Sequence, residues 1–170
     1  MSKPSKPAGM KPQNLEAWAA LATLLERLPT ALDTQLQRDS GLTHFEHGVL
    51  YALDSAPERK LRMSTLAGYA SSTLSRLSRA VTRLEKKGWM RRAVDPTDGR
   101  FTLAILTDEG HSKVAESTPA HHALVERLVF DALTVDQTRQ LGEISRRISE
   151  TIDTAPVWTP PSVKAPEPTG

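Results

Sequence analysis

The chain has 170 residues, a net charge of +2 and no cysteine. This length suffices for one domain with its own hydrophobic core. The lack of cysteine excludes disulfides, thiolate zinc sites and thiol redox chemistry. Because the basic, proline-containing start lacks the apolar core of a signal peptide and no apolar run is long enough to span a membrane, we expect a soluble cytoplasmic protein.

The charge is distributed unevenly along the chain. Residues 58–100 contain eleven of the 22 Lys and Arg residues but four of the 20 Asp and Glu residues. This segment therefore carries a net charge of +7, whereas the rest carries −5. A localised basic segment of this kind indicates a polyanionic partner.

Both ends have the composition of disordered tails, 1–13 and the proline-rich 155–170. Between them, apolar residues recur at threes and fours from Leu15 to Leu36, which predicts a long amphipathic helix within 14–39 with a bend at Pro29. Such an apolar helix needs a partner.

A second helix is predicted to begin after Thr43, because Thr43 and Glu46 have the spacing of a capping box, and to run to about Ser55. The pair Arg62 and Met63 is expected to be extended. A short third helix follows, for which Ser64 is the predicted N-cap.

The segment SSTLSRLSRAVTRLEKKG, residues 71–88, predicts a fourth helix with two distinct faces. At about 100° per residue, one arc holds the apolar side chains of Leu74, Leu77, Val81 and Leu84, and nearly the opposite arc holds Ser72, Arg76, Arg79, Arg83 and Lys86. Ser71 or Ser72 suits the N-cap and Gly88 suits the residue after the C-cap.

The segments WMRRAV and FTLAIL predict two strands joined at the tip DPTDGR. Thr107 is expected to open another helix, and Thr134 with Gln137 forms a second capping box before a final amphipathic helix. The order indicates a mainly α fold with a small antiparallel β-wing. We expect a winged helix-turn-helix lobe, 42–106, and a helical dimerisation layer from both chain ends, 14–39 and 107–154, in one domain of residues 14–154.

The fourth helix has the residue types that a helix in the DNA major groove needs, small hydroxyl side chains near its start and arginines that reach guanine edges. We assign base recognition to Ser75, Arg76 and Arg79, with Ser72 and Thr73 at the same end of the helix, and phosphate contacts to Arg83, Lys86, Lys87 and Arg92. The hairpin tip suits the minor groove, with Asp98 orienting Arg100. A solvated surface helix would explain the arginines alone, but not the preceding helix and the basic hairpin together.

The chain resembles the MarR family of bacterial transcription regulators through LTHFEHGVLYAL, LRMSTLAGYASSTLSRLSRAVTRLEKKGWMRR and DPTDGRFTLAILTDEG, which span 42–110. The resemblance implies a homodimer whose terminal helices interlock and whose winged lobes bind a pseudo-palindromic site. On that pattern the residues from Ser72 to Arg79 meet DNA, and Asp98 with Arg100 form the wing pair. It also implies a small aromatic effector between the dimer helices and the lobe, for which we name Trp18, Phe45, His47 and Tyr51; an ordinary aromatic core explains these four residues equally well.

The sequence gives little support for metal binding, cofactor binding or catalysis. His44 and His47 share one helix side without a visible third ligand, so we expect no metal site, and no cofactor motif or catalytic constellation is present. We therefore expect no enzyme, but a sequence-specific regulator of double-stranded DNA, acting as a homodimeric repressor that a small ligand releases. Two alternatives stay open: a nonspecific architectural DNA binder and a winged-helix module that binds an acidic protein.

Overall fold

The computed structural model describes residues 9–153 and Trp158. In chain order its elements are α1 (Pro12–Ser40), α2 (His44–Asp54), η1 (Pro57–Arg59), β1 (Lys60–Arg62), α3 (Met63–Tyr69), α4 (Leu74–Lys86), β2 (Met90–Val94), β3 (Thr102–Leu106), α5 (Asp108–Val125), the π-helical turn η2 (Glu126–Phe130) and α6 (Val135–Ile152). The predicted mainly α fold with a small antiparallel wing is confirmed. The predicted tails lie mostly outside the described residues, and α1 begins at Pro12, two residues before the predicted start.

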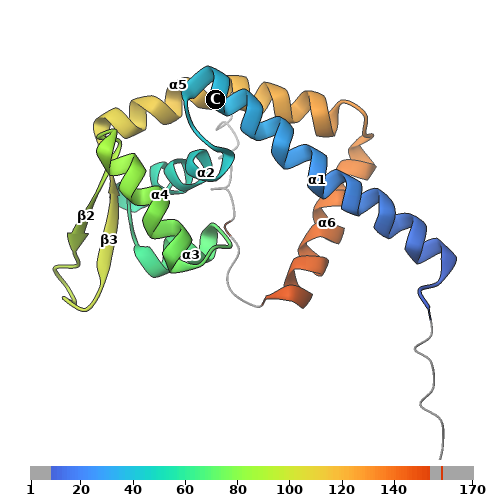
Figure 1. Cartoon of the computed structure of the whole chain (residues 1–170), viewed down its shortest axis with the longest axis horizontal. Coiled ribbons are helices and arrows are strands. Elements are labelled where there is room, and N and C mark those ends of the chain that lie inside the picture. The colour runs from blue at the N-terminus through green and yellow to red at the C-terminus, as the bar shows by residue number, and fades with distance from the viewer. Residues whose placement is uncertain (1–8, 154–157, 159–170) are drawn as a thin grey trace, which may run out of the picture.

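Two layers make up the molecule (Figure 1). The long helices α1 and α5 pack against each other along one side, and α2, α3, α4 and the sheet form a lobe beneath one end of them. The β2–β3 hairpin projects from the far side of this lobe, and α6 lies apart from it. α2 links the lobe to the long helices, because it packs against both α1 and α5.

The sheet is antiparallel with the strand order β1-β3-β2. β2 and β3 pair from Met90 opposite Leu106 to Val94 opposite Thr102, and β1 adds to the other edge of β3. The core of the lobe lies where α2, α3 and α4 cover the sheet, and it includes the fully buried side chains of Leu50, Leu66 and Leu77.

Helix starts follow local hydrogen bonding, and three predictions are confirmed. The capping box at Thr43 forms with both hydrogen bonds at 3.0 Å. The box at Thr134 also forms, and Thr107 caps α5. Gly88 takes a φ of +75° after α4, the conformation for which glycine is suited.

The predicted caps of α3 and α4 are wrong. α3 begins two residues earlier, at Met63 with Arg62 as its N-cap, because the chain passes from β1 directly into the helix, and Ser64 is therefore inside it. α4 is capped by Thr73, whose Oγ1 accepts a hydrogen bond from the Arg76 amide at 3.2 Å. Ser71 and Ser72 instead close α3: Ser71 has a φ of +46°, and the Ser72 amide donates to the Ala67 carbonyl at 2.9 Å.

Close packing at the start of α5 depends on Gly110. A Cβ atom there would overlap the carbonyl oxygen of Trp89 and press on the Leu106 side chain. Glycine therefore lets the first turn of α5 pack directly on the backbone that leads into β2, which fixes the hairpin relative to the long-helix layer.

Candidate nucleic-acid interface

The exposed side of α4 carries the predicted DNA-reading residues. The helix packs on the lobe through the fully buried Leu77, Ala80, Val81 and Leu84, while Ser75, Arg76, Arg79, Arg83 and Lys86 are exposed. Leu74, predicted to face inward, is 54% exposed because it lies in the first turn, beyond the core, and Ala80 is buried instead. The amphipathic assignment is otherwise confirmed, and α4 presents its cations to solvent.

Several of these cations are held by neighbouring elements. The Arg76 guanidinium lies over the Phe45 ring of α2, 4.3 Å from its centroid. Lys87 donates to the Gly41 carbonyl at 2.8 Å. Arg92 on β2 donates to the Glu85 carboxylate on α4, with the shortest bond, from Nη2, at 2.6 Å. These contacts fix the orientation of α4 relative to α2 and the hairpin.

The pair of Arg83 and Glu46 ties α4 to the start of α2. Arg83 Nε donates to Glu46 Oε1 at 2.7 Å, and the Glu46 side chain is buried. Burial raises the pKa of Glu46, but the hydrogen bond from the Thr43 amide and the pairing with Arg83 outweigh it, so the pKa lies below its ordinary value. Glu46 therefore remains a carboxylate that serves the capping box and anchors α4 at once.

Three exposed cations beside this network remain available for a ligand. Within residues 9–153 and Trp158, the side chains of Arg79, Lys86 and Arg91 make no hydrogen bond, ion pair or ring contact. Arg79 lines a shallow depression on α4 with Leu74, Ser75, Ser78, Thr82 and Arg83. Exposed cations without an intramolecular partner pair readily with phosphates or base edges.

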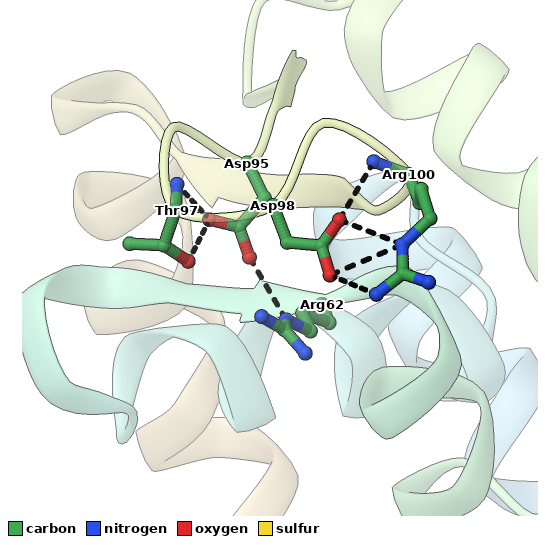
Figure 2. Close-up of polar contacts among 5 residues, drawn as sticks. All are labelled: Arg62, Asp95, Thr97, Asp98 and Arg100. Carbon is green, nitrogen blue, oxygen red and sulfur yellow. Dashed lines mark hydrogen bonds and ion pairs between the residues drawn. The ribbon is translucent and has the colours of Figure 1, made fainter.

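The wing tip is built around two aspartates (Figure 2). Asp98 accepts from Arg100 at 2.7 Å for Nη2 and at 2.9 Å for Nε, yet the Arg100 side chain is 84% exposed. These hydrogen bonds lower the pKa of Asp98 and keep it charged. The predicted wing pair thus comes together, with its guanidinium presented to solvent.

Asp95 at the wing tip and Arg62 at the end of β1 form a contact that was not predicted from the sequence. Asp95 is buried and accepts from the Thr97 hydroxyl at 2.7 Å, the Thr97 amide at 2.9 Å and Arg62 Nε at 2.8 Å. These bonds, led by the one from the Thr97 hydroxyl, lower its pKa to about 2. The Arg62 guanidinium also lies 4.1 Å from the centroid of the Phe101 ring. The Asp-x-Thr spacing was a visible signal for the first contact, but the pairing with β1 was not.

A crevice of about 610 Å³ separates α1 and α2 from the start of α4. Two of the four predicted effector residues, Phe45 and Tyr51, line it, and Arg76, Arg79 and Arg83 enter it from α4. Trp18 is not part of its lining and is 51% exposed on α1, because it lies about three helical turns before the lining residue Pro29. His47 is buried on the inner side of α2 and is not part of the lining either.

Four histidines, His44, His47, His121 and His122, lie close together beside this crevice, and His44 is also part of its lining. The rings of His47 and His121 lie 4.7 Å apart, and those of His44 and His121 lie 5.5 Å apart. Burial, followed by repulsion from neighbouring histidines, lowers the pKa of both His47 and His121 to about 4. No group of three or more His, Cys, Asp or Glu side chains suited to a metal ion occurs in the described part of the chain.

A family model and two solved structures that this chain resembles all name the same family. The model of the MarR family matches residues 40–100. The chain is 41% identical to Sco3205, a MarR family transcriptional regulator from Streptomyces coelicolor solved in complex with DNA, over 92% of this chain and 98% of that one, with a TM-score of 0.85. For AbsC, a MarR family regulator from the same organism, the identity is 28%, the coverage 85% and 97%, and the TM-score 0.81.

A relative of known function is also a transcriptional regulator. The transcriptional repressor MprA of Escherichia coli K12 is 29% identical over 104 residues, and the match spans 61% of this chain and 58% of that protein. Among the described residues, none of the helices has the length and apolar character needed to cross a membrane. The match to Sco3205 extends over both the lobe and the terminal helices, and the chain belongs to the MarR family of transcriptional regulators.

Proposed function

We propose that the protein is a homodimeric regulator that binds a specific pseudo-palindromic site in double-stranded DNA and represses transcription by occupying it. The observation that carries this proposal is the pairing of an exposed basic face on α4 with Arg100 at the wing tip, on two elements joined by Arg92 and Glu85. A helix in the major groove and a hairpin in the minor groove bind adjacent parts of one duplex. Sco3205, which shares the fold, was solved with DNA.

The contacts on α4 support different roles for its cations, base recognition for some and phosphate contact for others. Arg79 lies in the second turn with no competing partner among the described residues, so we assign it to a base edge, while Lys86 in the last turn is assigned to a phosphate. Arg92 is engaged with Glu85, which favours a role in holding the wing rather than a phosphate contact.

Fluorescence anisotropy on a duplex selected by the protein tests this assignment. Arg79→Ala should cost about 1 to 3 kcal/mol of binding free energy and relax one base preference, whereas Lys86→Ala should weaken all sequences about equally and reduce the salt dependence by about one counterion. Arg139→Ala, which removes an exposed arginine from α6 far along the chain, is the matched control and should have no effect. Equal and uniform losses for Arg79→Ala and Lys86→Ala would contradict the assignment.

The exposed apolar side chains of α1 and α6 support the dimer. α6 has no buried residue, and Ile144, Ile148 and Ile152 are 54%, 43% and 80% exposed. On α1, Leu15 and Leu25 are 56% and 57% exposed. Such faces are stable in water when a second copy covers them, and a twofold axis would place the two α4 helices at half-sites about 10 bp apart.

Sedimentation velocity tests the dimer. Ile148→Asp should convert the protein to monomers, because it would bury a carboxylate in the apolar interface. Ser149→Asp adds the same charge one position away, off the apolar arc, and should leave the dimer intact. A wild-type protein that sediments as a monomer at micromolar concentration would exclude the homodimer.

We also propose that the crevice accepts a small aromatic carboxylate. Phe45 and Tyr51 offer ring faces, and the three arginines of α4 offer positive charge. Because Arg76 and Arg79 belong both to this crevice and to the DNA-facing side of α4, an anion bound here would draw them away from DNA and lower operator affinity.

Thermal unfolding with a panel of phenolic acids tests the crevice. At least one should raise the melting temperature of the wild type, Tyr51→Leu should remove that shift, and Trp18→Phe, outside the lining, should keep it. No response to any compound would count against the effector.

A further inference from the structure

Trp158 stands out because it contacts the winged lobe although it follows α6. It is half-buried, packs against the hydrophobic core and lines the crevice. Its ring centroid lies 5.7 Å from that of Tyr51 with an interplanar angle of 70°. This is the edge-to-face arrangement in which two aromatic rings attract each other.

The crevice suits an indole ring. Its walls combine the rings of Phe45 and Tyr51 with Pro29, and arginine side chains from α4 reach the same space. The Arg76 guanidinium lies over the Phe45 ring, so the lining of the crevice combines a cation with an aromatic surface. An indole offers both an apolar face and a polar edge, so it matches a site that is apolar on one side and wet on the other.

Because Trp158 follows α6 closely in the chain, its contact with the lobe restricts the position of the end of α6. Ile152 ends α6, so five residues lie between that end and Trp158, and the six Cα-to-Cα steps span roughly 20 Å at most. α6 itself buries no residue and lies apart from the lobe (Figure 1). A docked Trp158 therefore limits how far the end of α6 can move from α2.

We propose that Trp158 is an internal aromatic ligand of the crevice, which tethers the C-terminal end of α6 to the DNA-binding lobe. The crevice is then an interaction surface for the chain's own Trp158 side chain, and any aromatic compound that enters it meets Trp158 there. The proposal concerns docking alone and does not depend on the DNA or effector proposals.

Fluorine NMR on the full chain labelled with 5-fluorotryptophan tests the docking. The chain has three tryptophans, and the resonance that disappears in Trp158→Phe belongs to Trp158. In the native protein, this resonance should shift less between H2O and D2O than it does in urea, because docking removes solvent from the ring. Tyr51→Leu should move it toward the urea position and leave the resonances of Trp18 and Trp89 unchanged.

Two further variants make the result decisive. Gly48→Leu adds a side chain from α2 into the crevice, where a Cβ atom meets nothing within 4 Å, and should expel Trp158 without disturbing the core. Phe101→Ala removes a ring from the wing and should leave the Trp158 resonance in place. The proposal is overturned if the native Trp158 resonance shows the full solvent shift, or if neither Tyr51→Leu nor Gly48→Leu moves it. If Trp158 does not dock, the DNA affinity measured by anisotropy is unaffected. The docking proposal and the DNA-binding proposal can therefore fail independently.

Discussion

Acidification from pH 7 to about pH 5 should destabilise this protein through the buried histidines. His47 and His121 are 4% and 6% exposed, and the pKa of each lies near 4. The unfolded chain binds protons at these residues below about pH 6.5, whereas the folded chain does not. As far as these two histidines are concerned, the free energy of unfolding is therefore highest above pH 6.5 and decreases as the pH falls toward 4.

The magnitude follows from the two pKa values. A histidine with a pKa of about 4 in the folded state and about 6.5 when unfolded lowers the free energy of unfolding by about 2 kcal/mol between pH 7 and pH 5. Because both rings stay neutral in the folded state at about pH 5, the pair accounts for up to about 4 kcal/mol. Carboxylates contribute little in this window, since most are already ionised at its lower end.

Urea unfolding followed by circular dichroism, at one fixed protein concentration, measures this loss. His47→Phe keeps an aromatic ring beside His121 and should remove about half of the pH dependence. His122→Asn changes an exposed histidine of the same cluster and serves as the control, with a pH dependence close to that of the wild type. The reasoning is refuted if the wild type has the same free energy of unfolding at both pH values, or if His47→Phe retains the full dependence.

Three other outcomes are expected from the same unfolding assay. Gly110→Ala should destabilise by about 1 to 3 kcal/mol or more, since the overlap is with the Trp89 backbone, and an unchanged stability would contradict the packing described. Leu77→Ala should cost about 2 to 5 kcal/mol, but Leu74→Ala less than about 1 kcal/mol, because the first side chain is fully buried and the second is 54% exposed. The pKa of Asp95 is lowered to about 2, so its ionised carboxylate stabilises the folded protein above about pH 4 and this contribution is lost as the pH falls toward 2. In Asp95→Asn, the free energy of unfolding should therefore depend less on pH between about pH 4 and pH 2.

Local patterns predicted most of the fold. The capping box at Thr43, the amphipathic α4 and the hairpin tip each depend on residues close together in the chain, and all three formed. Both cap errors arose where two elements join with almost no linker: α3 begins directly after β1 and includes Ser64, whereas Ser71 closes α3 and is not available to cap α4.

The candidate site was predicted less completely because its contacts join distant segments. Arg83 is 37 residues from Glu46, and no local pattern signals their pairing. The same holds for Arg62 with Asp95, which depends on β1 joining the sheet edge, and for His47 with His121, which depends on how α5 crosses α2. Only the tertiary fold identifies these partners.

The most direct test of the central claim is selection of duplexes from a random pool by the purified protein, followed by anisotropy of the enriched duplex against a scrambled one across a salt series. A specific homodimeric regulator should enrich an inverted repeat with half-sites about one helical turn apart and bind it at least roughly a thousandfold more tightly than the scrambled duplex. Equal affinity for both duplexes would instead indicate an architectural DNA binder, and binding to neither would indicate that the basic face of α4 contacts an acidic protein.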